Sequence, residues 1–152
     1  MNVYDRLEEL GIKLSDPTPK GGIYSLIRPY GDHLLYVSGT APHNAVDENM
    51  AGKLGSEYTI EEGQEAARRC MINIISNLHH ELGDLNRIKQ FVKLLGFVAS
   101  APDFYEHPQV INGASQLLKD VFGDKSVCPP DRQSEWRHFP GIYRLRLNWF
   151  WN

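Results

Sequence analysis

The sequence predicts an α+β fold, because two long stretches with helical periodicity are interleaved with short runs of strand-forming residues. A length of 152 residues and a hydrophobic content of 41% suit one domain with a real core. The expected order of elements is a short helix, a β-hairpin, a long helix, a strand and a second long helix.

The N-terminal third is expected to form a short helix and the hairpin. Residues 2–10 place Val3, Leu7 and Leu10 on one helical face, and Gly11 stands at the position of a C-terminal cap. Residues 23–28 and 34–37 have the composition of strands, the second of them buried, and the loop 29–32 has hairpin length. The polar stretch 41–57 is expected to be an exposed excursion.

The two long helices have clear boundaries in the sequence. Thr59 and Glu62 have the spacing of a capping box, and Gly83 ends the apolar periodicity that follows. A second helix is expected over 110–122, with Asp103 or Pro108 near its start and Gly123 at its end. Between the helices, residues 88–99 are apolar and β-rich. They predict a strand covered on both faces, with a buried helix as the open alternative.

The order of elements leaves the C-terminus unexplained. Residues 124–152 show neither helical nor strand period over most of their length, and all three tryptophans lie in the last 17 residues. Because three strands would leave much of two helices uncovered, one or two further strands are expected after residue 123. Only residues 142–151 alternate like a strand. We therefore divide the chain into a domain over 1–123 and an atypical C-terminal tail over 124–152.

Six stretches together carry a resemblance to a known family. They are Gly22-Ile-Tyr24, Leu35-Tyr-Val-Ser-Gly39, the capping-box region 59–67, the turn Leu82-Gly-Asp-Leu85, and 92–98 with Asp103-Phe104. The chain resembles the YjgF-type reactive-intermediate deaminase (Rid) family, also called the endoribonuclease L-PSP family, and within it a side branch without a settled activity. The resemblance implies a chorismate-mutase-like two-layer fold with a mixed sheet packed by two main helices. It also implies a homotrimer with clefts between subunits.

The same resemblance implies the candidate site. Tyr24, Ser38 and Gly39 align with residues of the family's cleft, which takes a small-molecule ligand and needs no cofactor or metal. The family's helix asparagine falls at Pro108, and Asn112 lies one turn on. From local sequence alone, Ser38-Gly39 can also be read as a simple strand end or bulge.

The tail departs from the family at its most important residues. The family pattern expects a strand like ARSAVGVASLP, with a carboxylate-binding arginine, and an acidic residue in the last strand. Pro130-Asp131 stand at the arginine's approximate place, and Arg132 or Arg137 could compensate. The reaction implied by the resemblance, hydrolysis of an imine or enamine, is therefore left open. The alternatives are a non-catalytic binding or assembly module, an endoribonuclease, and an impaired product.

The genetic code offers a reason for the altered tail. Back-translation of residues 127–152 with permitted codons, read two bases later, can give VPARSAVGVASLPRNIPVEIELVLE, which contains both missing strands. The hypothesis is a single-base frameshift near residues 125–128.

Other chemistry-bearing residues have simpler explanations. Lys and Arg are scattered and the formal net charge is -3, so nucleic-acid binding is not expected. The absence of a signal peptide and of a membrane-length apolar run favours a cytoplasmic protein without membrane contact. Cys70 and Cys128 form no metal or disulfide spacing. The adjacent His79 and His80 cannot share a helix face as a metal pair. The carboxylates near the start of the long helix are explained by capping and by the helix dipole: Glu61, Glu62 and Glu65.

Overall fold

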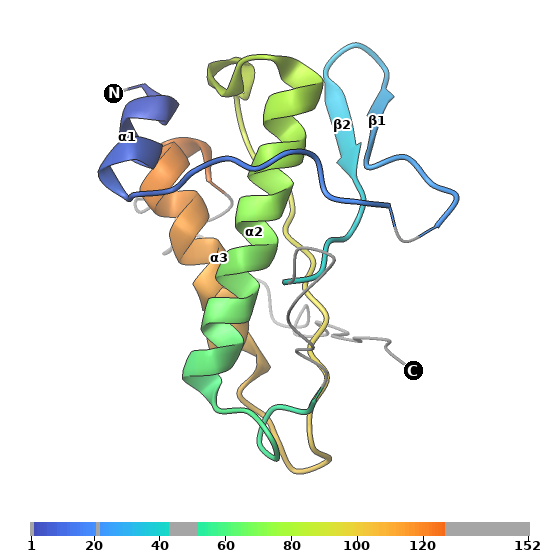
Figure 1. Ribbon diagram of the computed structural model, residues 1–152, viewed down its shortest axis with the longest axis vertical. Coiled ribbons are helices and arrows are strands. Elements are labelled where there is room, and N and C mark those ends of the chain that lie inside the picture. Colours follow the sequence, from blue (N-terminus) through green and yellow to red (C-terminus); the bar gives the residue numbers. More distant parts are fainter. Residues whose placement is uncertain (1, 21, 43–51, 127–152) are drawn as a thin grey trace, which may run out of the picture. The chain divides into compact units, whose positions relative to one another are not determined.

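The computed structural model describes residues 2–20, 22–42 and 52–126. The chain divides into two compact units, one made of Met1–Met50 and Arg69–Arg87 and the other of Ala51–Arg68 and Ile88–Asn152. The long helix α2 (Ile60–Leu82) contributes to both units, and each unit is described below by itself (Figure 1). Within the described residues, three α-helices and one antiparallel hairpin confirm the predicted α+β class.

The first unit begins with helix α1 (Val3–Glu9), as predicted. The Asn2 side chain accepts a hydrogen bond from the Tyr4 N–H at 3.0 Å, which satisfies a free donor at the helix start. Val3 and Leu7 are buried, whereas Leu10 is 40% exposed and is not part of the core. Gly11 has a φ of 66°, the left-handed conformation that favours glycine after a helix.

The hairpin consists of β1 (Ile27–Tyr30) and β2 (Leu34–Val37). The second strand has the predicted bounds, but the first begins at Ile27 and runs through Pro29 and Tyr30, which were predicted to be loop. Ser38 N–H donates to Leu26 O at 2.8 Å, so Leu26 and Ser38 form a hydrogen-bonded pair of the ladder. Hydrogen-bonded and non-hydrogen-bonded pairs alternate along an antiparallel ladder. The Pro29–Leu35 pair is then a non-bonded one, where a proline removes no ladder bond.

The prediction that residues 34–37 are buried is wrong. Leu34 is 41% exposed and Tyr36 is 69% exposed. They share one face of the hairpin with their cross-strand partners Tyr30 and Arg28. A two-stranded sheet packs against the rest of its unit with one face only, so the opposite face, which carries these side chains, lies at the surface of the unit.

Helix α2 starts and ends as the sequence predicts. The Thr59 N–H donates to the Glu62 carboxylate at 2.8 Å, and the Glu62 N–H donates to the Thr59 hydroxyl at 3.3 Å, which completes the capping box. Gly83 follows the helix with a φ of 72°. The next turn leads into a short 3-10 helix, η1 (Leu85–Arg87), whose Leu85 is fully buried.

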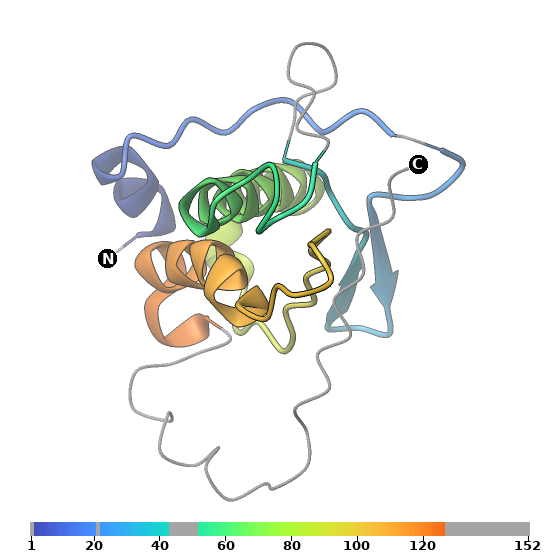
Figure 2. The same ribbon diagram turned by 90° about the horizontal axis from the view of Figure 1, so that it is seen from below.

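The second unit contains helix α3 (His107–Phe122), which starts near Pro108 and not near Asp103 (Figure 2). A short 3-10 helix, η2 (Gly123–Lys125), follows it. One face of α3 is buried, and Val110 forms a cluster with Val98 and Phe104. Glycines allow close packing here, because a Cβ on Gly113 would lie 2.7 Å from the backbone carbon of Gln64 in α2.

The strand predicted over residues 88–99 is not formed among the described residues, and neither is the alternative helix. The described sheet has two strands, both in the hairpin, so a mixed sheet is not seen within residues 2–20, 22–42 and 52–126. The prediction that both faces are covered is also wrong, since Val92 is 78% exposed and Leu95 is 50% exposed. A strand requires a hydrogen-bonded neighbour, and its own sequence does not supply one. The strands expected after residue 126 lie outside the described residues.

Candidate functional site

The candidate site lies where β2 ends. Ser38 is half-buried, and its backbone N–H continues the ladder to Leu26 O. Its hydroxyl donates to Ser25 O at 2.6 Å. Because the hydroxyl proton is used in this bond, the oxygen of Ser38 remains as an acceptor for a ligand's N–H or O–H group.

Gly39 provides open space next to this hydroxyl. Gly39 is exposed, and no described atom lies within 4 Å of the position that a Cβ at this residue would occupy. The alternation of the ladder directs its N–H away from β1. Within the described residues, no backbone carbonyl accepts from this N–H. A ligand oxygen could therefore approach the main chain here.

The chain after Gly39 is held in place by helix α2. The Thr40 hydroxyl donates to Cys70 O at 2.9 Å, and the Asn73 side-chain amide donates to Ala41 O at 3.0 Å. These two bonds fix the residues that follow the strand, so the position of Gly39 is set on both sides.

Tyr24 belongs to the same end of the hairpin. It precedes Ser25, the acceptor of the Ser38 hydroxyl, and it is 42% exposed. Its N–H donates to Gly22 O at 3.1 Å, which forms a tight turn before the strand. The first unit thus brings Tyr24, Ser38 and Gly39 together at one hairpin end.

Asn112, the fourth predicted residue, lies in the second unit. It is exposed on α3, one turn after Pro108 in the first turn of that helix. The tail residues considered as a replacement for the family's arginine site lie outside the described residues: Pro130, Asp131, Arg132 and Arg137. Cys128 lies outside them as well.

Helix α2 buries a row of polar side chains that were not predicted from the sequence. Asn73, Ser76 and Asn77 are 5%, 0% and 3% exposed. Ser76 Oγ accepts from Ser15 N–H at 3.2 Å, and the Asn77 side chain bonds both the backbone and the hydroxyl of Thr18. Their spacing of three and four residues was a readable signal, because it places them on one helical face.

The two histidines of α2 have structural partners. Tyr4 Oη accepts from Leu85 N–H at 3.0 Å and lies 2.9 Å from His79 Nδ1. His80 Nε2 lies 3.1 Å from Ser15 O. No group of three or more His, Cys, Asp or Glu side chains in the described part of the chain is placed to hold a metal ion. The histidines tie α1 and the following connector to the helix.

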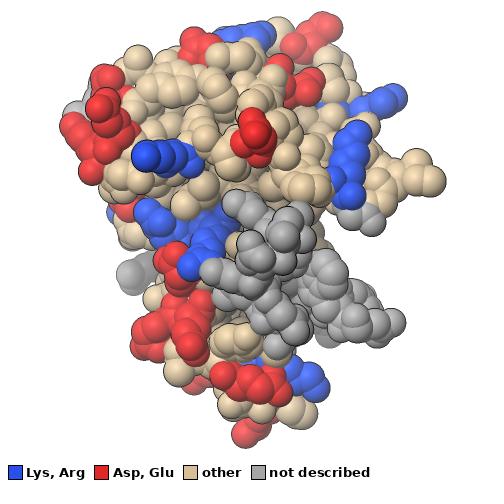
Figure 3. All heavy atoms as spheres, viewed as in Figure 1, with Lys and Arg blue, Asp and Glu red and all other residues tan. Residues whose placement is uncertain are grey.

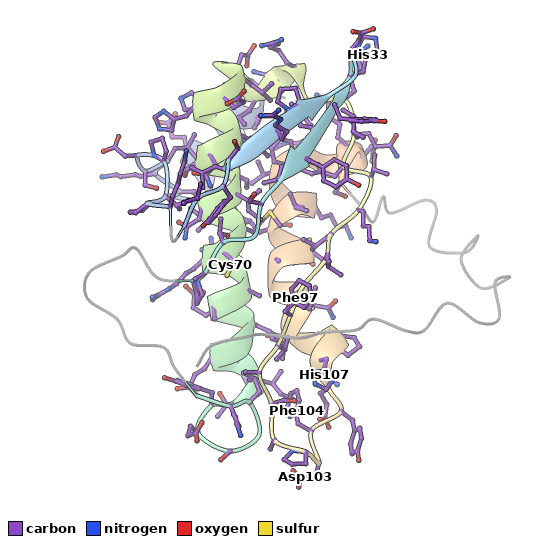
Figure 4. The ribbon with its side chains drawn as sticks, turned by 90° about the vertical axis from the view of Figure 1, so that its right-hand side faces the viewer. His33, Cys70, Phe97, Asp103, Phe104 and His107 are labelled. Atoms are coloured by element: carbon purple, nitrogen blue, oxygen red, sulfur yellow. The ribbon has the colours of Figure 1, made fainter. Side chains whose placement is uncertain are left out.

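A serine and a histidine form a close pair in the second unit. Ser100 Oγ lies 3.0 Å from His107 Nε2, and the ring of Phe104 packs edge-on against the histidine at 5.1 Å between centroids (Figure 4). Among the described residues, no carboxylate is hydrogen-bonded to the other ring nitrogen of His107. The pair therefore lacks the orienting acid of a catalytic triad.

Cys70 is predicted to be unreactive in the folded protein. Burial raises the pKa of its thiol to about 12, well above the ordinary value of 9.0 for an exposed thiol. Only the thiolate is nucleophilic, so alkylation of Cys70 by iodoacetamide at pH 8 should be slow until the chain unfolds. Mass spectrometry of a Cys128→Ser variant measures Cys70 alone. Rapid native labelling would contradict the burial.

The raised pKa also fixes a pH dependence of stability. Below about pH 9 the thiol is protonated in both states, and its contribution to folding is fully present. Between about pH 9 and about pH 12 the unfolded chain loses its proton first, so this contribution is lost as the pH rises.

Comparisons with known proteins agree with this fold. Residues 5–130 match the family model described as "YjgF/chorismate mutase-like, putative endoribonuclease". The chain is 44% identical to protein TCP17 of Trypanosoma cruzi over 119 residues, which are 78% of this chain and 74% of that protein.

Two solved structures resemble the chain. A putative endoribonuclease from Shewanella oneidensis has a TM-score of 0.77 and 33% identity, with 82% of each chain covered. A protein of unknown function from Agrobacterium tumefaciens has a TM-score of 0.72 and 38% identity, covering 81% of this chain and 75% of that one. The family match spans most of the sequence and includes the strand end that carries Ser38 and Gly39. The chain belongs to the YjgF/chorismate-mutase-like family.

Proposed function

We propose that this protein binds a small metabolite bearing a carboxylate and an imine or enamine group at the end of β2. The observation that carries the proposal is the open space over Gly39, beside a Ser38 oxygen that keeps its acceptor capacity. The Gly39 N–H would donate to a ligand oxygen, and Ser38 would accept from the ligand's N–H. The exposed Tyr24 ring would pack against the ligand.

Hydrolysis is the reaction that this ligand class allows. Water adds to the carbon of the C=N bond, and the resulting carbinolamine expels ammonia to leave a carbonyl. The site supplies a hydrogen-bond acceptor and a backbone donor, whereas Pro130-Asp131 stand in the sequence at the approximate place of the family's carboxylate-binding arginine. Binding without turnover is therefore the alternative form of the same proposal.

Assembly into a homotrimer is part of the proposal. The hairpin presents Tyr30, Leu34 and Tyr36 on one face, and these side chains are 72%, 41% and 69% exposed. An apolar face of this kind is a typical association surface. The solution mass of this chain, measured beside a version with the reconstructed tail, tests the assembly and also shows whether the altered tail prevents it.

Substitution of Gly39 gives the sharpest test of the site. Alanine there meets no described atom within 4 Å, so the Tm should stay unchanged while the methyl group blocks the ligand. We expect Gly39→Ala to weaken binding of short 2-oxo acids, the hydrolysis products of 2-imino acids, by about tenfold or more. Titration followed by NMR measures this effect, and release of ammonia from a 2-imino acid measures turnover.

Two further variants provide a second line, and a third is the control. Ser38→Ala and Tyr24→Ala should also weaken binding, whereas Tyr105→Ala removes a more exposed ring in the second unit and should not. If Gly39→Ala, Ser38→Ala and Tyr24→Ala all bind 2-oxo acids as well as the original chain, the proposed site is wrong.

An RNA-cleaving role is the second candidate, favoured by the endoribonuclease description of the family and of one related structure. On the face that Figure 3 shows, Lys and Arg are interspersed with Asp and Glu and form no continuous basic surface. RNA binding that weakens steeply with salt would support this alternative.

A frameshifted gene would make the chain an impaired relative of an active ancestor. Sequencing the gene decides this, because the hypothesis requires an alternate frame that encodes both missing strands. None of the helices in the described part of the chain has both the length and the apolar character needed to cross a bilayer. The cysteine usage, with no disulfide framework, supports a proposed cytoplasmic location.

A further inference from the structure

Ser100 and His107 form a polar pair in the second unit that the proposed binding site does not use. Ser100 Oγ lies 3.0 Å from His107 Nε2, and both side chains are half-buried. The two residues stand at the two ends of the loop 101–106. A serine hydroxyl within hydrogen-bond distance of an imidazole nitrogen is the arrangement of a nucleophile and its general base.

The backbone of Ser100 is held in place on both sides. Leu54 N–H donates to Ala99 O at 3.0 Å, and Ala101 N–H donates to Leu54 O at 2.9 Å. These two bonds form a parallel bridge between Leu54 and Ser100. The main chain therefore sets the direction of the Ser100 side chain, as a positioned nucleophile requires.

The ring of His107 is oriented by packing. Phe104 is 8% exposed in a buried cluster with Val98 and Val110, and its ring meets His107 edge-on at 5.1 Å between centroids (Figure 4). Phe104 is itself closely packed, because a Cβ on Gly55 would lie 2.9 Å from its Cδ2 atom. A wall of this kind fixes the plane of the imidazole, which is one of the tasks of the acid in a catalytic triad.

Two backbone donors accompany the pair. His107 is the first residue of α3, so its N–H has no partner within the helix. Among the described residues, no group accepts from the N–H of His107 or from that of Ser100. The positive end of the helix dipole also favours negative charge at this point. These donors are available to an oxygen that gains negative charge beside Ser100.

Exposed carboxylates limit the substrates that suit this pair. Asp103 and Glu106 lie on the loop 101–106, and both are exposed. No Lys or Arg belongs to residues 100–109. Because like charges repel, an anionic acyl group is disfavoured here and a small uncharged ester is preferred. This preference distinguishes the pair from the site at Gly39, which would take a carboxylate ligand.

We propose that Ser100 is a nucleophile toward small uncharged esters and that His107 is its general base. Ser100 Oγ forms a bond to the carbonyl carbon while its proton passes to His107 Nε2. The bond to the alcohol then breaks, and the alcohol leaves with that proton. Water gives a proton to His107 in the same way and attacks the acyl carbon. The carboxylic acid leaves, and the proton returns to Ser100.

Labelling of the full chain with phenylmethanesulfonyl fluoride tests the nucleophile. Ser100 Oγ would displace fluoride from the sulfur atom, and mass spectrometry of peptides measures the sulfonyl group at each serine. Ser56 is the internal control, because it is an exposed serine of the same unit whose hydroxyl is bonded to no histidine among the described residues. We expect Ser100 to react about tenfold or more faster than Ser56. Equal rates at the two serines would overturn the proposal.

Variants of His107 separate a general base from a structural partner. Glutamine at this position can keep a hydrogen bond to the Ser100 hydroxyl but cannot take its proton, so His107→Gln should lose the fast labelling. In His107→Ala, added imidazole should restore part of it. Fast labelling of Ser100 in His107→Gln would show that His107 is not the base. Amide exchange in peptides from α3 checks that each variant is folded.

Ester turnover tests the reaction itself. The original chain should release nitrophenol from p-nitrophenyl acetate, a small uncharged ester, about tenfold or more faster than Ser100→Ala. Equal release by the original chain and by Ser100→Ala would overturn the assigned reaction.

Discussion

Replacing Gly113 with alanine is expected to lower the free energy of unfolding by about 2 kcal/mol. The added Cβ would lie 2.7 Å from the backbone carbon and 2.9 Å from the Cα of Gln64, and backbone atoms of a helix cannot move aside cheaply. Alanine gains about 1 kcal/mol of helix propensity over glycine, so the overlap must outweigh that gain. Thermal unfolding should show a Tm lower by about 4–8 °C.

Gly39→Ala is the matched control for this substitution. The same methyl group is added where no described atom lies within 4 Å, so the Tm should stay close to that of the original chain. Equal Tm values for Gly113→Ala, Gly39→Ala and the original chain would show that α2 and α3 do not pack closely at Gly113.

Asn77→Ala is expected to destabilise the first unit by about 2–3 kcal/mol. Asn77 is 3% exposed, and its side chain accepts from Thr18 N–H at 2.9 Å and donates to the Thr18 hydroxyl at 2.9 Å. Removing the amide leaves a backbone donor without its partner in a buried place, which costs more than the net value of the bond. Urea unfolding, with the slope against denaturant unchanged, measures the loss.

A double-mutant cycle isolates the bond to the hydroxyl. Thr18→Val removes the hydroxyl and keeps the backbone N–H, so its effect should be smaller than that of Asn77→Ala. The coupling energy between the two substitutions should be about 1 kcal/mol. Asn112→Ala removes an exposed amide from α3 and should change stability by no more than about 0.5 kcal/mol. A coupling energy of zero would show that the hydrogen bond between the Asn77 side chain and the Thr18 hydroxyl does not contribute to stability.

The candidate site was only partly readable from the sequence. Ser38 and Gly39 could be identified because a strand that ends in a small hydroxyl residue and a glycine has a local signature. The bonds that fix them could not, because Ser25 O and Cys70 O are backbone atoms brought close only by folding. The buried Asn73, Ser76 and Asn77 were overlooked for a related reason: a polar row on a helix indicates solvent until a connector is found packed over it.

The sequence by itself determined the helices of this protein, because their boundaries depend on near neighbours. The Thr59–Glu62 capping box, the glycines after α1, α2 and α3, and the apolar period all act within a few residues of the chain. Only the tertiary structure decided the strands. Pro29 joined β1 because its ladder position needs no N–H, whereas residues 88–99 have strand composition without a described ladder partner. A strand depends on hydrogen bonds to a distant segment, and no local pattern contains that segment.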